Sequence, residues 1–161
     1  MGNTAEFELI DFLLKNGLTV ATAESCTGGM VAARLTSVSG ASGAFKYGAV
    51  TYCNEAKHVM LDVSTETLDE HGAISSETAK EMAEGIRKVM NADIGVSVTG
   101  NAGPGAAENK AVGLVYVGVS SDAYSAVLEN HFEGDRVSVR AQAADAALSL
   151  ALAAAKKLAE G

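Results

Sequence analysis

The sequence predicts an α/β protein, a three-layer α/β/α sandwich in which a mixed β-sheet lies between two layers of helices. Helical and strand patterns alternate along the chain without segregating, which is typical of a sheet covered by helices. Two short apolar runs each end in a glycine-rich loop, at residues 24–29 and 99–105. The 161 residues suffice for a single domain over 1–161 with one sizeable core.

Caps and periodicity predict the elements of the first half. Apolar residues at helical spacing indicate a helix over 5–16, with Asn3 or Thr4 as its N-cap and Gly17 as its stop. A β-prone run then predicts a buried strand, a glycine-rich turn leads into the next helix, and a loop of small residues leads to a second strand. Asn54 can cap the helix that follows. These later elements are expected as a strand over 18–23, a helix over 30–36, a strand over 47–52, and helices over 55–61 and 64–71.

The second half is predicted in the same way. Residues 74–77 offer a cap for a long helix. Branched apolar residues that alternate with small ones indicate a buried strand before the 99–105 loop, and a strand pair is expected around Ser121 and Asp122. The alanine-rich carboxyl-terminal stretch predicts a helix. In order, we expect a helix over 77–90, strands over 94–98, 113–119 and 126–132, and a helix over 136–158.

Composition and charge exclude several classes of function. Twelve basic residues stand against 20 acidic ones, and the formal net charge of −8 argues against non-specific nucleic-acid binding. No apolar run approaches the ~18 residues of a membrane span, and the acidic start lacks the basic region of a signal peptide, so we expect a cytoplasmic protein that does not bind membranes. Cys26, Cys53 and three scattered histidines form no metal-binding pattern, so we expect neither a metal nor another cofactor.

The loop over 24–29 is a candidate ligand site, because ligands of such folds lie beyond the carboxyl ends of the strands. Ser25 and Thr27 offer hydroxyl groups, and Gly28 and Gly29 expose backbone amides at the start of a helix. This combination suits an anion or a carboxamide. A capped helix after a tight turn explains the same residues equally well.

The loop over 99–105 is the second candidate and could face the same pocket. It holds the only proline of the chain and three glycines. It fails the dinucleotide-binding fingerprint, because Glu108 stands where the third glycine belongs. A rigid loop that closes a pocket and a plain connecting turn both remain open interpretations.

Two sets of residues could supply a nucleophile. Ser42 lies in a near miss of the nucleophile elbow, and Tyr52 and Lys57 follow it closely. A neutral lysine in a pocket can accept the proton of a serine, although Lys57 could equally be a surface lysine. Cys26 could act as a thiol nucleophile with a distant histidine, or be a small buried cysteine.

Arg136 and Arg140 are four residues apart at the start of the last predicted helix, so they share one helix face. Two guanidinium groups on one face suit a phosphate. Arginine near a helix N-terminus is unfavourable for the macrodipole, which favours a role other than helix stability. A solvated pair near Glu133 and Asp135 is the alternative.

Seven short segments, taken in order, carry a resemblance to a known family. They are AESCTGG at 23–29, VSGASGAF at 38–45, VTYCNEAK at 50–57, AISSETA at 73–79, SVTGNAGPG at 97–105, VGLVYVGV at 112–119 and FEGDRVSVR at 132–140. Together they closely resemble the C-terminal domain family of the competence- and damage-inducible protein CinA, over about residues 5–160. Stand-alone members of that family include nicotinamide-nucleotide amidases.

The resemblance implies an α/β/α fold and an enzymatic activity. The reaction would be hydrolysis of the carboxamide of nicotinamide mononucleotide to nicotinic acid mononucleotide and ammonia, a step of pyridine-nucleotide recycling. The resemblance implies Ser42 as the nucleophile and Lys57 as the general base, with Tyr52 orienting or relaying the proton. A non-catalytic module that binds a nucleotide or a partner in the same pocket is the alternative function.

The resemblance also implies how a small-molecule nucleotide would be held. The Ser25 loop and the loop of Thr99 and Gly100 would hold the ligand. Arg140 would meet the phosphate, with Arg136 as a close competitor. The last helix or an edge strand could support a homodimer.

Three positions depart from the usual family pattern. Cys53 stands where serine is usual, Ser39 where proline is usual, and Asn101 where an apolar residue is common. The first and second changes adjoin the segments of Tyr52 and Ser42, and the third puts the shape of a ligand loop in question.

Overall fold

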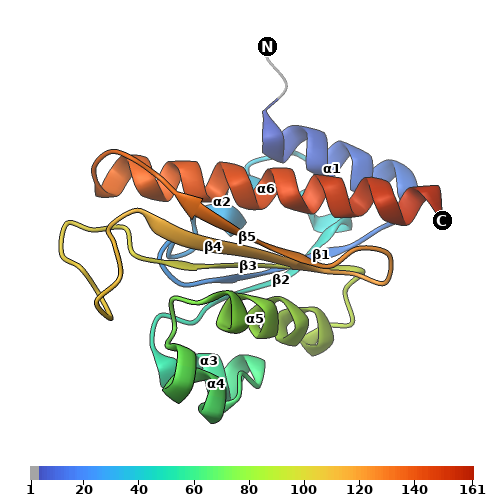
Figure 1. Ribbon diagram of the computed structural model, residues 1–161. Helices are drawn as coiled ribbons and strands as arrows, with labels where there is room; N and C mark the ends of the chain where they lie inside the picture. The colour runs from blue at the N-terminus through green and yellow to red at the C-terminus, as the bar shows by residue number, and fades with distance from the viewer. Residues whose placement is uncertain (1–3) are drawn as a thin grey trace.

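A five-stranded mixed sheet forms the middle layer of the protein (Figure 1). The computed structural model describes residues 4–161. The strand order is β2-β1-β3-β4-β5. The strands are β1 (Val20–Glu24), β2 (Phe45–Val50), β3 (Ile94–Gly100), β4 (Leu114–Ser120) and β5 (Ala126–His131). β1 pairs in parallel with β2 and β3, whereas β4 is antiparallel to both β3 and β5, so the predicted mixed sheet is confirmed.

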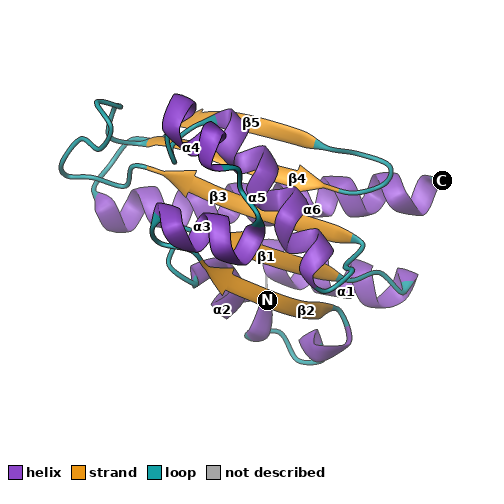
Figure 2. Ribbon diagram, turned by 90° about the horizontal axis from the view of Figure 1, so that it is seen from below, coloured by secondary structure: helices purple, strands orange, loops and turns teal. Residues whose placement is uncertain are grey.

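Helices cover both faces of the sheet, as Figures 1 and 2 show. One layer consists of α1 (Ala5–Asn16), α2 (Met30–Thr36) and α6 (Arg136–Glu160). The opposite layer contains α5 (Ser76–Val89), which packs on the sheet, and α3 (Asn54–Leu61) and α4 (Thr65–His71), which pack on α5. The predicted three-layer α/β/α fold is therefore confirmed.

Helix ends follow the predicted capping residues with one exception. The Thr4 side chain accepts from the backbone N–H of Phe7, and Gly17 ends α1 in the left-handed region with φ of 63°. Asn3, the other candidate cap, lies outside the described residues. Asn54 is the first residue of α3 rather than its cap, because the Sγ atom of Cys53 accepts from the N–H of residue 56 at 3.4 Å.

Two apolar clusters hold the layers together. The larger cluster joins α1, α2 and α6 to one face of the sheet, and the smaller one lies under α5 on the other face. α3 approaches the backbone of α5 closely: a Cβ atom at Gly85 would lie 2.0 Å from the carbonyl oxygen of Leu61. This close contact fixes the position of α3, the helix that carries Lys57.

The three parallel strands end at one edge of the sheet. Glu24, the last residue of β1, pairs with Val50 at the end of β2 and with Val98 near the end of β3. The segments that follow these strands therefore meet at that edge, which is where ligands bind in open α/β sheets.

Candidate functional site

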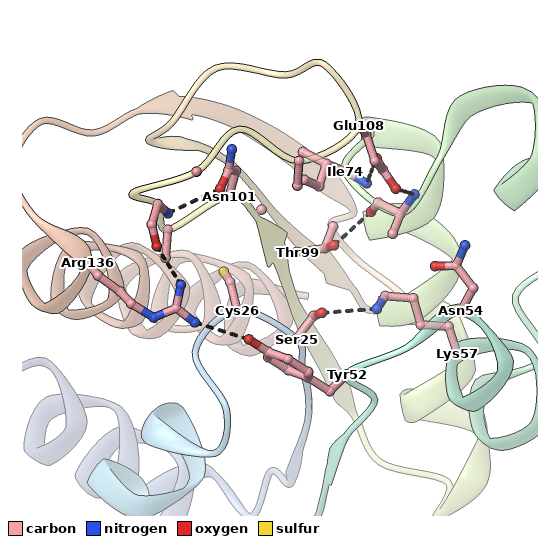
Figure 3. A pocket seen from close by; sticks show the side chains of 16 residues that line it. Ser25, Cys26, Tyr52, Asn54, Lys57, Ile74, Thr99, Asn101, Glu108 and Arg136 are labelled. Carbon is pink, nitrogen blue, oxygen red and sulfur yellow. Dashed lines mark hydrogen bonds between the residues drawn. The ribbon is translucent and has the colours of Figure 1, made fainter.

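A pocket of about 440 Å³ opens at the carboxyl ends of β1, β2 and β3 (Figure 3). Its volume lies in the range of small-molecule sites. Both glycine-rich loops contribute to it, together with the segment after β2 and the start of α6. Its lining includes Ser25, Cys26, Tyr52, Asn54, Lys57, Ala73, Ile74, Thr99, Gly100, Asn101 and Arg136.

Lys57 lies at the centre of the polar contacts of this pocket. Its side chain is only 1% exposed. The Nζ atom donates to the carbonyl oxygen of Thr51 at 2.7 Å and lies 3.0 Å from Oγ of Ser25. Burial lowers the pKa of Lys57, because desolvation disfavours the charged amine. A neutral amine in this position can accept the proton of the Ser25 hydroxyl.

The loop that carries Ser25 is held firmly on its inner side. The backbone N–H of Ser25 donates to the carbonyl of Val98 at 2.9 Å. The buried carboxylate of Glu24 accepts from the N–H groups of Val31 and Ala32, at 2.9 and 3.0 Å, in the first turn of α2. These bonds satisfy amides that a helix N-terminus leaves free. They also tie the loop to the helix that follows it.

The turn of this loop requires its two glycines. Gly28 and Gly29 have φ of 59° and 105°, a region that side chains with a Cβ atom rarely adopt. The N–H of Gly28 donates to the carbonyl of Ser25 at 3.0 Å and closes the turn. The two glycines thus shape the loop around Ser25.

Arg140 braces the same loop from the α6 side. Its Nε and Nη2 atoms donate to the carbonyl oxygens of Cys26 and Thr27, each at 3.0 Å. Among the described residues, the pocket lining does not include Thr27, Gly28, Gly29 or Arg140. The guanidinium of Arg140, which the resemblance implies as the phosphate ligand, thus bonds to loop backbone and does not line the pocket.

Arg136 is the other arginine that the sequence predicts near the ligand. It lines the pocket, and its guanidinium donates to the carbonyl of Gly103 at 2.6 Å and to the hydroxyl of Tyr52 at 3.1 Å. Figure 3 shows Arg136 at the opposite side of the pocket from Lys57, with Ser25 between them. Arg136 therefore provides a cation, which suits an anionic group, some distance from the Ser25 hydroxyl.

Ser42 does not meet Lys57, so the expected Ser42–Lys57 pair is wrong. Ser42 lies in a short 3₁₀ helix (Ala41–Gly43) before the first residue of β2, and it is exposed. Lys57 bonds to Thr51, which directly follows the last residue of β2. The strand rises about 3.3 Å per residue, so roughly 20 Å of β2 separates the two ends. The structure brings Ser25 to Lys57 instead.

Thr99, a predicted ligand-binding residue, and Asn101, one of the departures from the family pattern, both line the pocket. Thr99 lies at the end of β3 and donates its hydroxyl to the carbonyl of Ala73 at 2.7 Å. Asn101 stabilises its own loop: Oδ1 accepts from the N–H of Gly103, and Nδ2 donates to the carbonyl of Lys110. The departure at position 101 is thus a residue that holds the loop in shape.

Cys26 lacks the surroundings of a reactive thiol. It is buried, and desolvation raises the pKa of its thiol to about 11. No histidine is found among the described residues that line the pocket. These observations argue against the thiol–histidine alternative.

Across residues 4–161, His, Cys, Asp and Glu form no group of three that could hold a metal ion. No helix in the same range has the length and apolarity needed to cross a bilayer.

The fold and the pocket define a class: an α/β/α domain with a mixed sheet and a small-molecule pocket at the ends of its parallel strands, built around a buried lysine. Residues 3–155 match the CinA C-terminal domain family, and the chain belongs to that family. The resemblance of the seven sequence segments is thereby confirmed.

Similar proteins support this membership. The chain is 49% identical over 141 residues to a CinA-like protein of Kosmotoga olearia, covering 87% of this chain and 34% of that protein. A CinA-like protein of Acidobacterium capsulatum is 46% identical over 150 residues, covering 92% of this chain and 36% of that protein. The chain thus spans about a third of the length of the curated relatives it matches.

Solved structures share the whole fold. The competence/damage inducible protein CihA from Agrobacterium tumefaciens is 38% identical, with a TM-score of 0.87 and 96% of each chain covered. A CinA superfamily protein from Klebsiella pneumoniae is 34% identical, with a TM-score of 0.90, covering 98% of this chain and 97% of that one.

Proposed function

We propose that this protein hydrolyses the carboxamide of nicotinamide mononucleotide, with Ser25 as the nucleophile and Lys57 as the general base. The observation that carries the proposal is the 3.0 Å contact between Ser25 Oγ and the buried Lys57 Nζ. A hydroxyl next to an amine with a lowered pKa is an activated nucleophile. The substrate class comes from the family resemblance, and the assignment of Ser25 replaces that of Ser42.

The chemistry follows from these two groups. Ser25 Oγ bonds to the carboxamide carbon while its proton passes to Lys57 Nζ. The C–N bond of the tetrahedral intermediate then breaks, and the departing nitrogen takes that proton to leave as ammonia. Water attacks the resulting ester, again with Lys57 as base, and releases the carboxylate product and the Ser25 hydroxyl.

Thr51 positions the base for both steps. Its carbonyl oxygen accepts a hydrogen bond from Lys57 Nζ at 2.7 Å. In the neutral amine this bond uses one N–H and leaves the nitrogen lone pair available toward Ser25. The carbonyl thus orients Lys57 without taking part in proton transfer.

The cationic side of the pocket suits the phosphate of the mononucleotide. Arg136 can exchange its bonds to Gly103 and Tyr52 for phosphate oxygens, since bidentate contacts with phosphate are strong. The resemblance implies that Tyr52 orients or relays the proton. Because its hydroxyl accepts from Arg136, it is better suited to orient that guanidinium.

Ammonia release from nicotinamide mononucleotide tests the proposal. Ser25→Ala should lower kcat by about a thousandfold or more, because loss of the nucleophile removes the covalent route. Ser42→Ala is the matched control: it removes an exposed hydroxyl at the other end of β2 and should retain wild-type turnover. Mass spectrometry of enzyme trapped with substrate should place the acyl group on the peptide that contains Ser25.

Two outcomes would refute this function. Near-wild-type turnover by Ser25→Ala would reject the assigned nucleophile. Tight binding of the mononucleotide by the wild-type protein with no ammonia release would favour the alternative, a non-catalytic nucleotide-binding module; such binding would still raise the Tm.

A further inference from the structure

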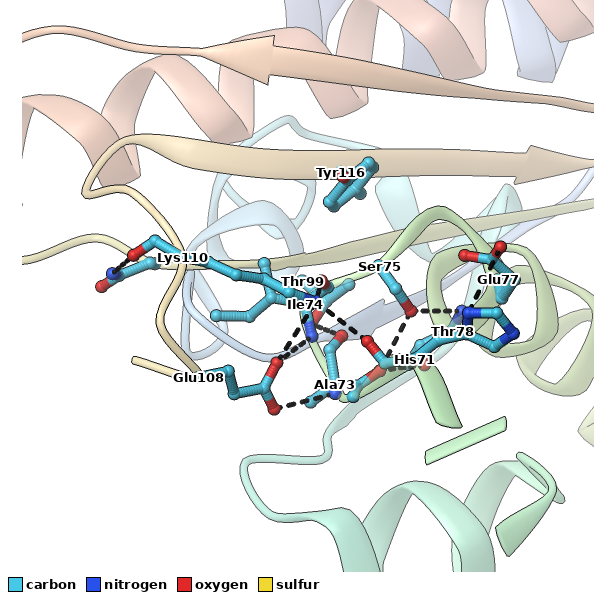
Figure 4. Close-up of polar contacts among 12 residues, drawn as sticks. His71, Ala73, Ile74, Ser75, Glu77, Thr78, Thr99, Glu108, Lys110 and Tyr116 are labelled. Carbon is cyan, nitrogen blue, oxygen red and sulfur yellow. Dashed lines mark hydrogen bonds and ion pairs between the residues drawn. The ribbon is translucent and has the colours of Figure 1, made fainter. Parts of the chain in front are cut away.

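The chain between β3 and β4 folds across one side of the pocket and meets the connection between α4 and α5 (Figure 4). The contact is made by Glu108, whose two carboxylate oxygens accept from the N–H groups of Ala73 and Ile74, at 2.9 and 3.0 Å. Ala73 and Ile74 line the pocket, and we call them the Ala73–Ile74 wall. Bonds from backbone N–H groups to a carboxylate are stronger than those between neutral groups.

Lys110 binds the same α4–α5 connection, but its positive charge acts on carbonyl oxygens where Glu108 acts on N–H groups. Its Nζ donates to the carbonyl of His71 at 2.9 Å and to the carbonyl of Ile74, and it lies 3.7 Å from Glu108 Oε1. Glu108 and Asn109 have φ of 56° and 58°, and residues 107 and 110 form an isolated antiparallel bridge. This tight turn presents both charged side chains to the same target.

The far side of the wall is also held by side chains. Thr99 donates to the carbonyl of Ala73, and Thr78 donates to the carbonyl of Gly72 at 2.7 Å. Gly72 allows the close approach of the carboxylate, because a Cβ atom there would lie 2.6 Å from Glu108 Oε1. Side chains from other segments thus take the place of regular secondary structure in fixing residues 72–74.

We propose that Glu108 and Lys110 form a latch that fixes the Ala73–Ile74 wall and thereby sets how tightly the pocket holds the ring that bears the carboxamide. Ile74 of this wall lies on the same side of the pocket as Lys57, away from Arg136 (Figure 3). With Arg136 on the phosphate, the ring lies between this wall and Ser25. This assignment of the ring rests on the proposed function. Lys110 is therefore a positioning residue that acts through the wall, whereas Glu108 both holds the wall and itself lines the pocket.

The latch should affect ligand binding more than the chemical step. The Ser25–Lys57 contact depends on β1 and α3, and no hydrogen bond of the Glu108–Lys110 turn reaches either element. Desolvation lowers the pKa of Lys57, and the charge of Glu108 raises it by a smaller amount. A contact made equally in the ground state and the transition state changes KM and leaves kcat nearly constant.

Amide hydrogen exchange and calorimetry test the latch separately from catalysis. In Glu108→Ala, exchange at the amides of Ala73 and Ile74, resolved by NMR, should accelerate at least tenfold. Asp69→Ala is the matched control, because it removes an exposed carboxylate from nearby α4. In a Ser25→Ala background, where chemistry is blocked, Glu108→Ala should weaken the Kd for nicotinamide mononucleotide about tenfold. When Ser25 is intact, Glu108→Ala should raise KM and leave kcat nearly constant.

Lys110→Met provides a second variant that keeps the Glu108 carboxylate. It should accelerate exchange at Ile74 and raise Kd less than Glu108→Ala does. Unchanged exchange at Ala73 and Ile74 in a folded Glu108→Ala protein would overturn the latch, as would faster exchange with an unchanged Kd. Absence of ammonia release by the wild-type protein would instead refute the proposed function, and the exchange and Kd values would still decide the latch.

Discussion

At the scale of single residues, the burial of Lys57 gives the site its pH dependence. Desolvation lowers the pKa of this amine from its ordinary value of 10.5. The proposed base works only when it is neutral, so kcat/KM should rise with pH through the lowered pKa of Lys57 and then level off below pH 10.5. Measuring ammonia release across pH 6–10 checks this prediction.

Lys57→Met is the control for this profile. The apolar side chain fills the same space but accepts no proton, so its small residual rate should lack the rise. A wild-type rate that falls over the same range would contradict a neutral amine as the base. The free energy of unfolding should also rise with pH. Between the lowered pKa of Lys57 in the folded protein and its ordinary value in the unfolded chain, the folded state binds fewer protons, so stability increases with pH there.

The choice between Ser25 and Ser42 shows what the sequence could and could not reveal. Both serines lie in small-residue loops, and either could be paired with Lys57 on sequence spacing. The discriminating signal was present: Ser25 follows a predicted strand, whereas Ser42 precedes one, and ligands bind beyond carboxyl ends. The contact between Ser25 and Lys57 could not be derived from the sequence. The two residues are 32 positions apart, and they meet only because of the way α3 lies beside the end of β1.

At the scale of elements, the loop after β1 is held between two helices. Glu24 ties it to α2, and Arg140 of α6 ties down the carbonyls of Cys26 and Thr27. Arg140→Met leaves both carbonyls without these donors, which should cost about 1–3 kcal/mol of unfolding free energy. It should also lower kcat about tenfold or more, since Ser25 loses its fixed position. Urea unfolding and steady-state kinetics measure the two effects.

Arg136→Met is the matched comparison, one helical turn earlier on the same face of α6. It removes the cation that lines the pocket, so KM should rise at least tenfold. It leaves one carbonyl, that of Gly103, without its guanidinium donor, so the free energy of unfolding should fall by less than in Arg140→Met, which affects two carbonyls. If Arg140→Met instead raised KM alone, Arg140 would be the phosphate ligand, as the family resemblance implies.

Element boundaries were more predictable than contacts between elements. Small side chains such as Thr4 and Ser75 cap helices through bonds to amides three residues ahead, a relation visible in the sequence. The cap of α3 was missed because Cys53, a weak acceptor, takes the position in place of Asn54. The Glu108 latch was missed because its partners are backbone amides 34 and 35 residues away, which no local pattern encodes.

At the scale of the whole molecule, each helical layer packs on its own face of the sheet and holds one member of the Ser25–Lys57 pair. The larger apolar cluster joins α1, α2 and α6 to the sheet, and the smaller cluster supports the layer that contains α3. Leu148 belongs to the first cluster, and Leu61 belongs to the second, one helical turn beyond Lys57. Both leucines are fully buried, so truncating either one to alanine removes the same side-chain atoms and leaves a cavity in one layer or the other.

Leu61→Ala and Leu148→Ala should therefore show how a packing defect in each layer affects the pocket. Each should lower the free energy of unfolding by about 2–5 kcal/mol, measured by urea denaturation. Leu61→Ala should also reduce kcat about tenfold, because α3 rests on α5 through the contact at Gly85 and a cavity beside it lets Lys57 shift from Ser25. Leu148→Ala should keep kcat within twofold for the folded protein. Equal losses of kcat in the two variants would mean that the sheet transmits packing defects to the pocket from either face.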